Sequence, residues 1–133
     1  NLEVACSVGV ETIVPGTVTD LNNGLAKVLV EQHVFTAVPP EDLAGHADVL
    51  VCFRAEDVTL RTGDALKDSA RNHVSGRIAA IDSEGAVERI TLDCGFPLVA
   101  LVTRQAREEM GLTVGTVVTA AVKATAVHLI PRN

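Results

Sequence analysis

The sequence has very few aromatic residues: among 133 residues there is no Trp, no Tyr and only 3 Phe. Aliphatic side chains must therefore fill the core, and they suffice, because hydrophobic residues make up 47% of the chain. Single-stranded nucleic acids are commonly bound by stacking bases on exposed aromatic rings. With so few rings and a net charge of −6, the chain is not expected to bind nucleic acid or an acidic membrane surface.

Cysteine and histidine are also scarce, at 3 and 4 residues. The sequence contains no Cys-x-x-Cys pair and no histidine cluster, so neither zinc nor another metal is expected. Cys52 and Cys94 lie in apolar, strand-like runs and are expected to be buried as small hydrophobic side chains. An odd number of cysteines is typical of a reducing compartment, which favours a cytoplasmic location.

Targeting and catalytic motifs are missing as well. No apolar run approaches the roughly 18 residues that a membrane span requires, and no signal peptide is recognisable. We find no Gly-x-x-x-x-Gly-Lys-Ser/Thr phosphate loop, no Gly-x-Ser-x-Gly elbow and no Cys/His dyad of suggestive spacing. The chain is therefore not expected to be an enzyme by itself. It starts without Met, which is consistent with a domain of a longer protein.

Short alternating runs of apolar and polar residues, separated by turn residues, predict an all-β fold. Strong hairpin signals occur at Asn22-Asn23-Gly24 and at Ser83-Glu84-Gly85. A short helix is predicted from Thr103, as N-cap, through Met110, with Gly111 as its C′ residue. The stretch Pro39-Pro40-Glu41-Asp42-Leu43 can form only one turn of helix.

The two halves of the chain repeat the same order of elements. Pro15-Gly16-Thr17-Val18 parallels Ser75-Gly76-Arg77-Ile78, and Phe53–Leu60 parallels Val122–Leu129. Each copy holds about five short strands, with one short helix between the third and the fourth. This pattern predicts two tandem OB-like small β-barrels.

The predicted domains are residues 1–66 and residues 67–133. A unit of about 60 residues is marginally stable alone, so the two barrels are expected to pack together and to dimerise. Their charges differ: residues 1–68 hold 4 basic and 11 acidic side chains, a net charge of −7, and residues 69–133 hold 7 and 6, a net charge of +1. An anion site is therefore expected in the second half.

Hydrogen-bond donors are concentrated in Ser69-Ala70-Arg71-Asn72, which is followed four residues later by Gly76. All three polar side chains can donate, and donors at the mouth of a strand can hold an anion. Arginine has the planar fork that best matches an oxyanion. The alternative interpretation of the same residues is a polar turn before a strand.

This stretch resembles the opening signature of the molybdate/tungstate-binding oligomerisation domains, known as the molbindin or TOBE family. Two further family markers follow in order. Val102-Thr103-Arg104-Gln105-Ala106 with Gly111-Leu112 is similar to the middle marker, although many members carry serine where Ala106 stands. Lys123-Ala124-Thr125-Ala126-Val127 is similar to the closing strand. The resemblance implies an OB-like fold with bound molybdate or tungstate.

A tetrahedral dianion without a proton is held by donors, and acceptors are excluded. The resemblance implies the following oxyanion-binding set: Ser69, Ala70, Arg71, Asn72, Thr103, Lys123, Ala124 and Thr125. It also implies that the Ser69–Arg71 segment and Lys123 come from different subunits of a homodimer, which would couple binding to assembly.

Three of these residues have alternative interpretations. In the alternative interpretation, Arg71 pairs with Asp68 or caps a strand edge and does not bind the anion. Lys123 would be a solvated edge charge that blocks aggregation. Thr103 would be only a helix N-cap.

The first repeat departs from the family pattern, because Gly9, Glu11 and Glu56 stand where the second repeat has Ser69, Arg71 and Thr125. Carboxylates at these points would repel a dianion, so one anion per chain is expected. The first repeat is then expected to be a structural or docking barrel. Its Phe53–Val58 segment resembles a strand found after the ATPase core of many ABC importers.

The resemblance thus implies a cytoplasmic regulatory domain of an ABC importer ATP-binding subunit, which senses intracellular molybdate or tungstate. The expected partners are an ABC ATPase domain and the importer's membrane subunits, at the inner face of the membrane. Two alternatives remain open at this point: a stand-alone molbindin-type storage or buffering protein, and the effector domain of an oxyanion-responsive transcription regulator.

Overall fold

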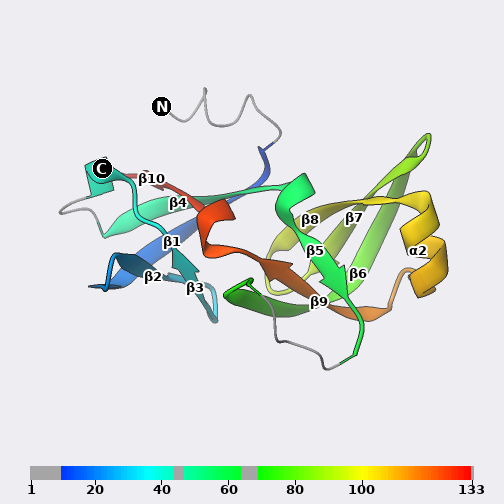
Figure 1. Cartoon of the computed structure of the whole chain (residues 1–133), viewed down its shortest axis with the longest axis horizontal. Coiled ribbons are helices and arrows are strands. Elements are labelled where there is room, and N and C mark those ends of the chain that lie inside the picture. Colours follow the sequence, from blue (N-terminus) through cyan, green and yellow to red (C-terminus); the bar gives the residue numbers. More distant parts are fainter. Residues whose placement is uncertain (1–9, 44–46, 64–68, 133) are drawn as a thin grey trace.

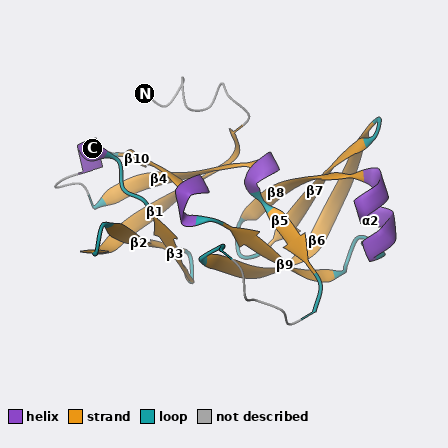
Figure 2. Ribbon diagram, viewed as in Figure 1, coloured by secondary structure: helices purple, strands orange, loops and turns teal. Residues whose placement is uncertain are grey.

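The structure is a computed structural model that describes residues 10–43, 47–63 and 69–132 (Figure 1). Within these ranges the chain is mainly strand, so the all-β prediction is confirmed (Figure 2). None of the helices in the described part of the chain has the length and hydrophobicity that a membrane crossing requires. The same residues contain no group of three or more His, Cys, Asp or Glu side chains suited to a metal ion.

The first sheet has the strand order β10-β4-β1-β2-β3. Its strands are β1 (Val10–Asn22), β2 (Leu25–Val30), β3 (His33–Ala37), β4 (Asp48–Arg54) and β10 (His128–Pro131). The 3-10 helix η1 (Glu41–Leu43) lies between β3 and β4 and corresponds to the single turn predicted there. All pairings are antiparallel.

The second sheet has the order β5-β9-β6-β7-β8 and is also antiparallel. Its strands are β5 (Thr59–Arg61), β6 (Asn72–Glu84), β7 (Val87–Asp93), β8 (Pro97–Thr103) and β9 (Val117–Val122). The helix α2 (Arg104–Met110) follows β8 at the end of the molecule remote from the first sheet (Figure 1). Two further 3-10 helices, η2 (Ala55–Asp57) and η3 (Ala124–Ala126), precede β5 and β10.

The two halves exchange their last strands. β5 follows β4 of the first sheet but pairs with β9 of the second, with Thr59 opposite Ala121. In return, β10 follows β9 but pairs with β4, with His128 opposite Cys52. The sheets therefore do not follow the predicted division into residues 1–66 and 67–133. Each is an open, OB-like sheet of five strands, in agreement with the predicted fold class, and its fifth strand comes from the other half.

The internal repeat is visible in the long strands β1 and β6. Both have 13 residues, and both carry a bulge before their outer end, between Val18 and Asp20 and between Ile78 and Ala80. A Cβ atom on Gly16 would lie only 2.8 Å from Val51 Cγ2, so a side chain there would clash with the core. The repeated glycine thus lets neighbouring strands pack closely.

The predicted local signals are confirmed in both halves. Asn23 and Gly24 have φ values of 55° and 75° in the turn between β1 and β2, as a two-residue hairpin of this kind requires. The hydroxyl of Thr103 accepts a hydrogen bond from the N–H of Ala106 and caps α2, which ends at Gly111 with φ 66°.

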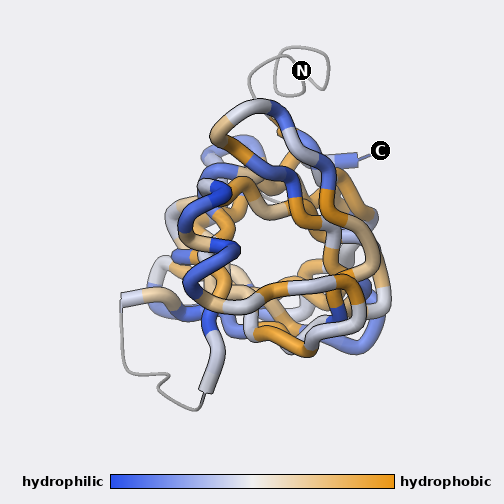
Figure 3. Tube along the Cα trace, turned by 90° about the vertical axis from the view of Figure 1, so that its right-hand side faces the viewer, coloured by the Kyte–Doolittle hydropathy of each residue, from blue (hydrophilic) through white to orange (hydrophobic). Residues whose placement is uncertain are grey.

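All three phenylalanines meet where the two halves join. Phe35 lies 5.3 Å from Phe53 and 6.2 Å from Phe96, measured between ring centroids. His33 on β3 contacts the carbonyl oxygen of Cys94 through Nε2 at 2.6 Å. Because Phe96 and Cys94 belong to the second half, the hydrophobic core is continuous between the halves. Seen along the long axis, hydrophobic and hydrophilic segments alternate along the trace of the chain (Figure 3).

Both cysteines in the described residues are buried, as predicted. The Cys52 side chain is fully buried, and Cys94 is 7% exposed. Burial raises the pKa of the Cys94 thiol, which makes the thiolate less available. These residues therefore act as small core side chains.

A buried carboxylate ties α2 to the second sheet. Glu88 on β7 is 1% exposed. It accepts a hydrogen bond from Ser83 Oγ at 2.6 Å and another from Arg107 Nε. Arg104 Nε lies 3.7 Å from the same carboxylate. The hydrogen bond from Arg107, followed by that from Ser83, lowers the pKa of Glu88.

We predict that Glu88→Gln lowers the urea midpoint at pH 7 and weakens the acid dependence of stability. A folded-state pKa below the unfolded value means that the stabilisation is present above the ordinary value of 4.5 and is lost as pH falls through the folded value. Urea unfolding between pH 3 and 7 measures this. Asp82→Asn, at an exposed position on β6, is the control. Parallel pH curves for wild type and Glu88→Gln would contradict the prediction.

Candidate functional site

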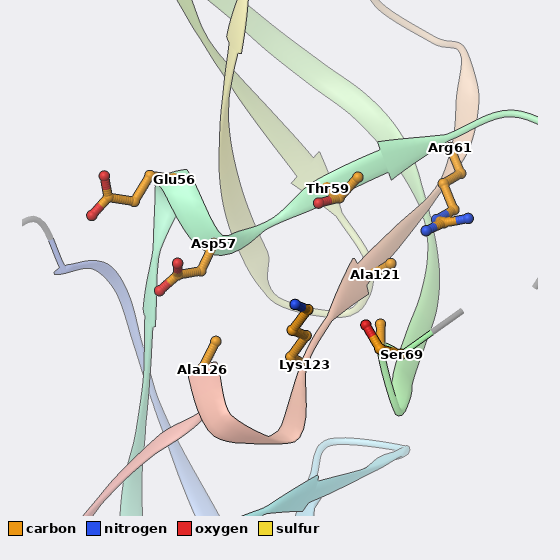
Figure 4. Close-up of a pocket in the computed structure, with 9 residues that line it drawn as sticks. Glu56, Asp57, Thr59, Arg61, Ser69, Ala121, Lys123 and Ala126 are labelled. Carbon is orange, nitrogen blue, oxygen red and sulfur yellow. The ribbon is translucent and has the colours of Figure 1, made fainter. Parts of the chain in front are cut away.

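A pocket of about 260 Å³ opens between the η2–β5 segment and the β9–η3 segment (Figure 4). Both segments carry the last strand of one half into the sheet of the other. The residues that line the pocket are Glu56, Asp57, Thr59, Arg61, Ser69, Ala70, Ala121, Lys123 and Ala126.

Strand pairing brings these distant segments together. β5 pairs with one edge of β9, where Arg61 lies opposite Thr119. β6 pairs with the other edge, where Asn72 lies opposite Val122. Ser69 and Ala70 precede β6, and Lys123 follows β9 directly, so all three lie at the same end of this three-strand unit.

Charge is unevenly distributed around the pocket. Figure 4 shows Arg61 and Ser69 toward one end, and the carboxylates of Glu56 and Asp57 toward the other. Lys123 lies between them. The first end offers a guanidinium and a hydroxyl, and Lys123 adds an ammonium between the two ends; all three groups are hydrogen-bond donors. Such a set can hold an anion through charge-assisted hydrogen bonds.

Three of the candidate residues line this pocket, namely Ser69, Ala70 and Lys123. Arg71 is exposed and is not among the lining residues. Ser69 and Lys123 were expected to approach each other from different subunits. In the structure they line one pocket of a single chain, because the pairing of β6 with β9 already brings their segments together.

Asn72 has its side chain committed elsewhere. It is 4% exposed, and its Oδ1 accepts a hydrogen bond from the backbone N–H of Thr36 at 2.7 Å. Its Nδ2 donates to the carbonyls of Thr36 at 2.9 Å and Val122 at 3.1 Å. Thr36 lies on β3 of the first sheet, so this amide clamps the two sheets together and does not reach the pocket.

The other three candidates also lie outside the pocket lining. The hydroxyl of Thr103 caps α2, and Thr103 lines a separate hollow beside that helix. Ala124 is buried in η3, where its carbonyl accepts a hydrogen bond from the N–H of Val38 at 3.3 Å. Thr125 is exposed on the same turn.

Sequence reasoning missed the residues that the first half contributes. Thr59 and Arg61 on β5 line the pocket beside Ser69. Glu56 was assigned to the first repeat, as the counterpart of Thr125, yet it lines the pocket with Lys123. The internal repeat identified these segments as equivalent, but equivalence does not reveal that they cross to the opposite sheet.

The positions that distinguish the first repeat are only partly described. Gly9 lies outside the described residues. Glu11 on β1 accepts a hydrogen bond from Arg89 Nε of the second sheet at 2.7 Å. Its carboxylate therefore contributes to the junction between the halves.

Comparison with known proteins adds to this geometry. Residues 68–129 match the family model of the TOBE domain. Over 130 residues, or 97% of this chain, the sequence is 32% identical to the molybdate/tungstate import ATP-binding protein WtpC of Pyrococcus horikoshii. The chain spans 35% of the length of that relative.

A similar solved structure is a crystal form of the cytoplasmic molybdate-binding protein ModG with molybdate bound. It matches with a TM-score of 0.84 at 26% sequence identity. The match covers 94% of this chain and 99% of that chain. The OB-like, two-sheet architecture is therefore shared over nearly the whole length of both chains.

We predict that Asn72→Ala destabilises the fold by about 2–4 kcal/mol, because it leaves buried backbone groups of Thr36 and Val122 without partners. Asn72→Asp is expected to cost more, since an acceptor would then face two carbonyl oxygens. Urea unfolding gives both values, and Ser75→Ala, at an exposed position on the same strand, is the control. If Asn72→Ala lowers the free energy of unfolding by less than about 0.5 kcal/mol, Asn72 does not clamp the two sheets together.

Proposed function

We propose, from the match of residues 68–129 to the family model of the TOBE domain, that the chain binds one molybdate or tungstate dianion in the pocket between η2–β5 and β9–η3. Ser69, Lys123 and Arg61 supply the donors. The observation that carries the proposal is that residues from three distant segments line one pocket of about 260 Å³.

The chemistry of this donor set suits a tetrahedral dianion. The ammonium of Lys123 and the guanidinium of Arg61 supply positive charge, and the hydroxyl of Ser69 can donate a hydrogen bond. Ala70 lines the same pocket next to Ser69. A pocket of this size accommodates a small ion together with several waters.

The remaining candidates have supporting roles in the proposal. Arg71 is exposed next to Ala70 and adds positive charge near the pocket mouth. Asn72 fixes the start of β6 through its three hydrogen bonds and thereby positions Ser69. Ala124 anchors η3 below Lys123, and Thr125 offers a hydroxyl on the exposed side of that turn.

We further propose that this binding regulates an ABC importer ATPase. The similarity to an import ATP-binding protein supports this context, since 97% of the present chain aligns with 35% of that relative. An ABC ATPase domain and importer membrane subunits are then the partners, at the cytoplasmic face of the membrane, and the chain acts as a homodimer. Bound oxyanion would favour one arrangement of the dimer and so report its intracellular concentration.

A second candidate function is oxyanion storage or buffering. It is favoured by the match to the molybdate-binding protein ModG, of which 99% is covered. The complete gene product distinguishes the two functions: a phosphate loop and an ABC signature upstream support the importer, and a native start near Asn1 supports storage.

The proposal predicts that isothermal titration shows tight binding of molybdate or tungstate, at about one anion per chain. Sulfate is expected to bind much more weakly, because it is smaller and leaves some donors out of reach. A stoichiometry near two would assign a site to the first half as well. Equal affinity for sulfate, or no heat with any of the three anions, would refute the proposal.

Removing the Lys123 ammonium tests the site directly. Lys123→Ala is predicted to weaken tungstate binding by about 1.5–3 kcal/mol, the value of a charge-assisted hydrogen bond, and to abolish the ligand-induced rise in Tm. Lys27→Ala is the matched control, because Lys27 lies on β2 and donates to Thr36 Oγ1. Sedimentation velocity with and without tungstate follows assembly. Normal tungstate binding by Lys123→Ala would contradict this prediction, and Lys123 would then be only a solvated charge at a strand edge.

A further inference from the structure

The proposed oxyanion pocket contains two carboxylates that a dianion site would be expected to exclude. Glu56 and Asp57, both on η2, line it together with Lys123. Glu56 is exposed and Asp57 is partly exposed. Among the described lining residues, two acidic and two basic side chains give a formal charge of zero.

Among the ion pairs formed by the described residues, none involves Glu56 or Asp57. The other charged groups of the lining are Arg61 on β5 and Lys123 at the end of β9. From one end of the pocket, the two carboxylates therefore act electrostatically on an anion held at the donor end.

The exchange of strands is what places this charge at the pocket. η2 is the segment that leads β5 into the second sheet, so any chain that supplies Arg61 to the pocket also brings Glu56 and Asp57. The corresponding residues of the second half, Thr125 and Ala126 on η3, are uncharged. The negative charge is thus specific to the segment from the first half.

We propose that Glu56 and Asp57 tune the affinity of the pocket for oxyanions by electrostatic repulsion, which holds the affinity below the value that the donors alone would give. This inference rests on the proposed function of the same pocket. The carboxylates do not contact the ligand. The two carboxylates repel the ligand from the opposite end of the pocket, whereas Lys123, Arg61 and Ser69 bind it.

The expected change in ligand affinity caused by each carboxylate follows from Coulomb's law in a hydrated pocket. A unit charge that acts on a dianion across several ångströms of solvent changes affinity by about two- to fivefold at physiological ionic strength. The effect scales with the charge of the ligand. A tetrahedral monoanion such as perrhenate therefore experiences half the repulsion that tungstate experiences.

The test compares tungstate and perrhenate by isothermal titration at constant pH and ionic strength, with Glu56→Gln, Asp57→Asn and the double variant. Each single variant is expected to bind tungstate about two- to fivefold more tightly than wild type, and the double variant about tenfold. For perrhenate, the expected fold-gain in affinity of each variant is the square root of its fold-gain for tungstate, because the repulsion energy is half as large. Glu41→Gln, an exposed carboxylate on η1 outside the pocket, removes the same charge and should leave both affinities unchanged.

The outcomes separate this inference from the function on which it rests. Tungstate binding by wild type with no gain in either variant overturns the inference and leaves the proposed function intact. Equal gains for tungstate and perrhenate also overturn it, because the cause is then local repacking. If neither wild type nor any variant binds tungstate, the proposed function fails and the inference falls with it.

Discussion

The backbone pairing of β5 with β9 and of β10 with β4 is the constraint on which the rest of the structure depends. Each half gives its last strand to the other, so neither sheet has five strands without its partner. A unit of about 60 residues can bury only a limited core. Strand exchange overcomes this limit, because it joins the two small halves into a single cooperative structure.

Side chains at the junction reinforce that exchange. The Phe35, Phe53 and Phe96 rings pack together across the halves, and Asn72 bonds to the backbone of β3. The same position in the first repeat is Thr12, whose hydroxyl accepts a hydrogen bond from the N–H of Val99 on β8 at 3.1 Å. Both repeats thus use the equivalent residue, Thr12 or Asn72, in the same way, as a buried polar link to the opposite sheet.

The exchange also explains the composition of the candidate site. Because β5 crosses to the second sheet, the pocket combines Arg61 of the first half with Ser69 and Lys123 of the second. The same crossing brings Glu56 and Asp57 to the lining. Attractive and repulsive charges therefore reach the pocket on one continuous segment, and the net charge of each half describes the site poorly.

The sequence by itself determined the all-β class, the internal repeat, the hairpin at Asn23-Gly24 and the Thr103-capped helix, because these depend on alternation, turn conformation and capping between near neighbours. Through a family resemblance it also predicted Ser69, Ala70 and Lys123 as site residues, and these three line the pocket. Only the tertiary structure decided that Asn72 is a clamp and that Arg61, Glu56 and Asp57 belong to the pocket. Two equivalent strands can pair within their own half or across to the other with the same local pattern, and the choice is made by long-range pairing and core packing.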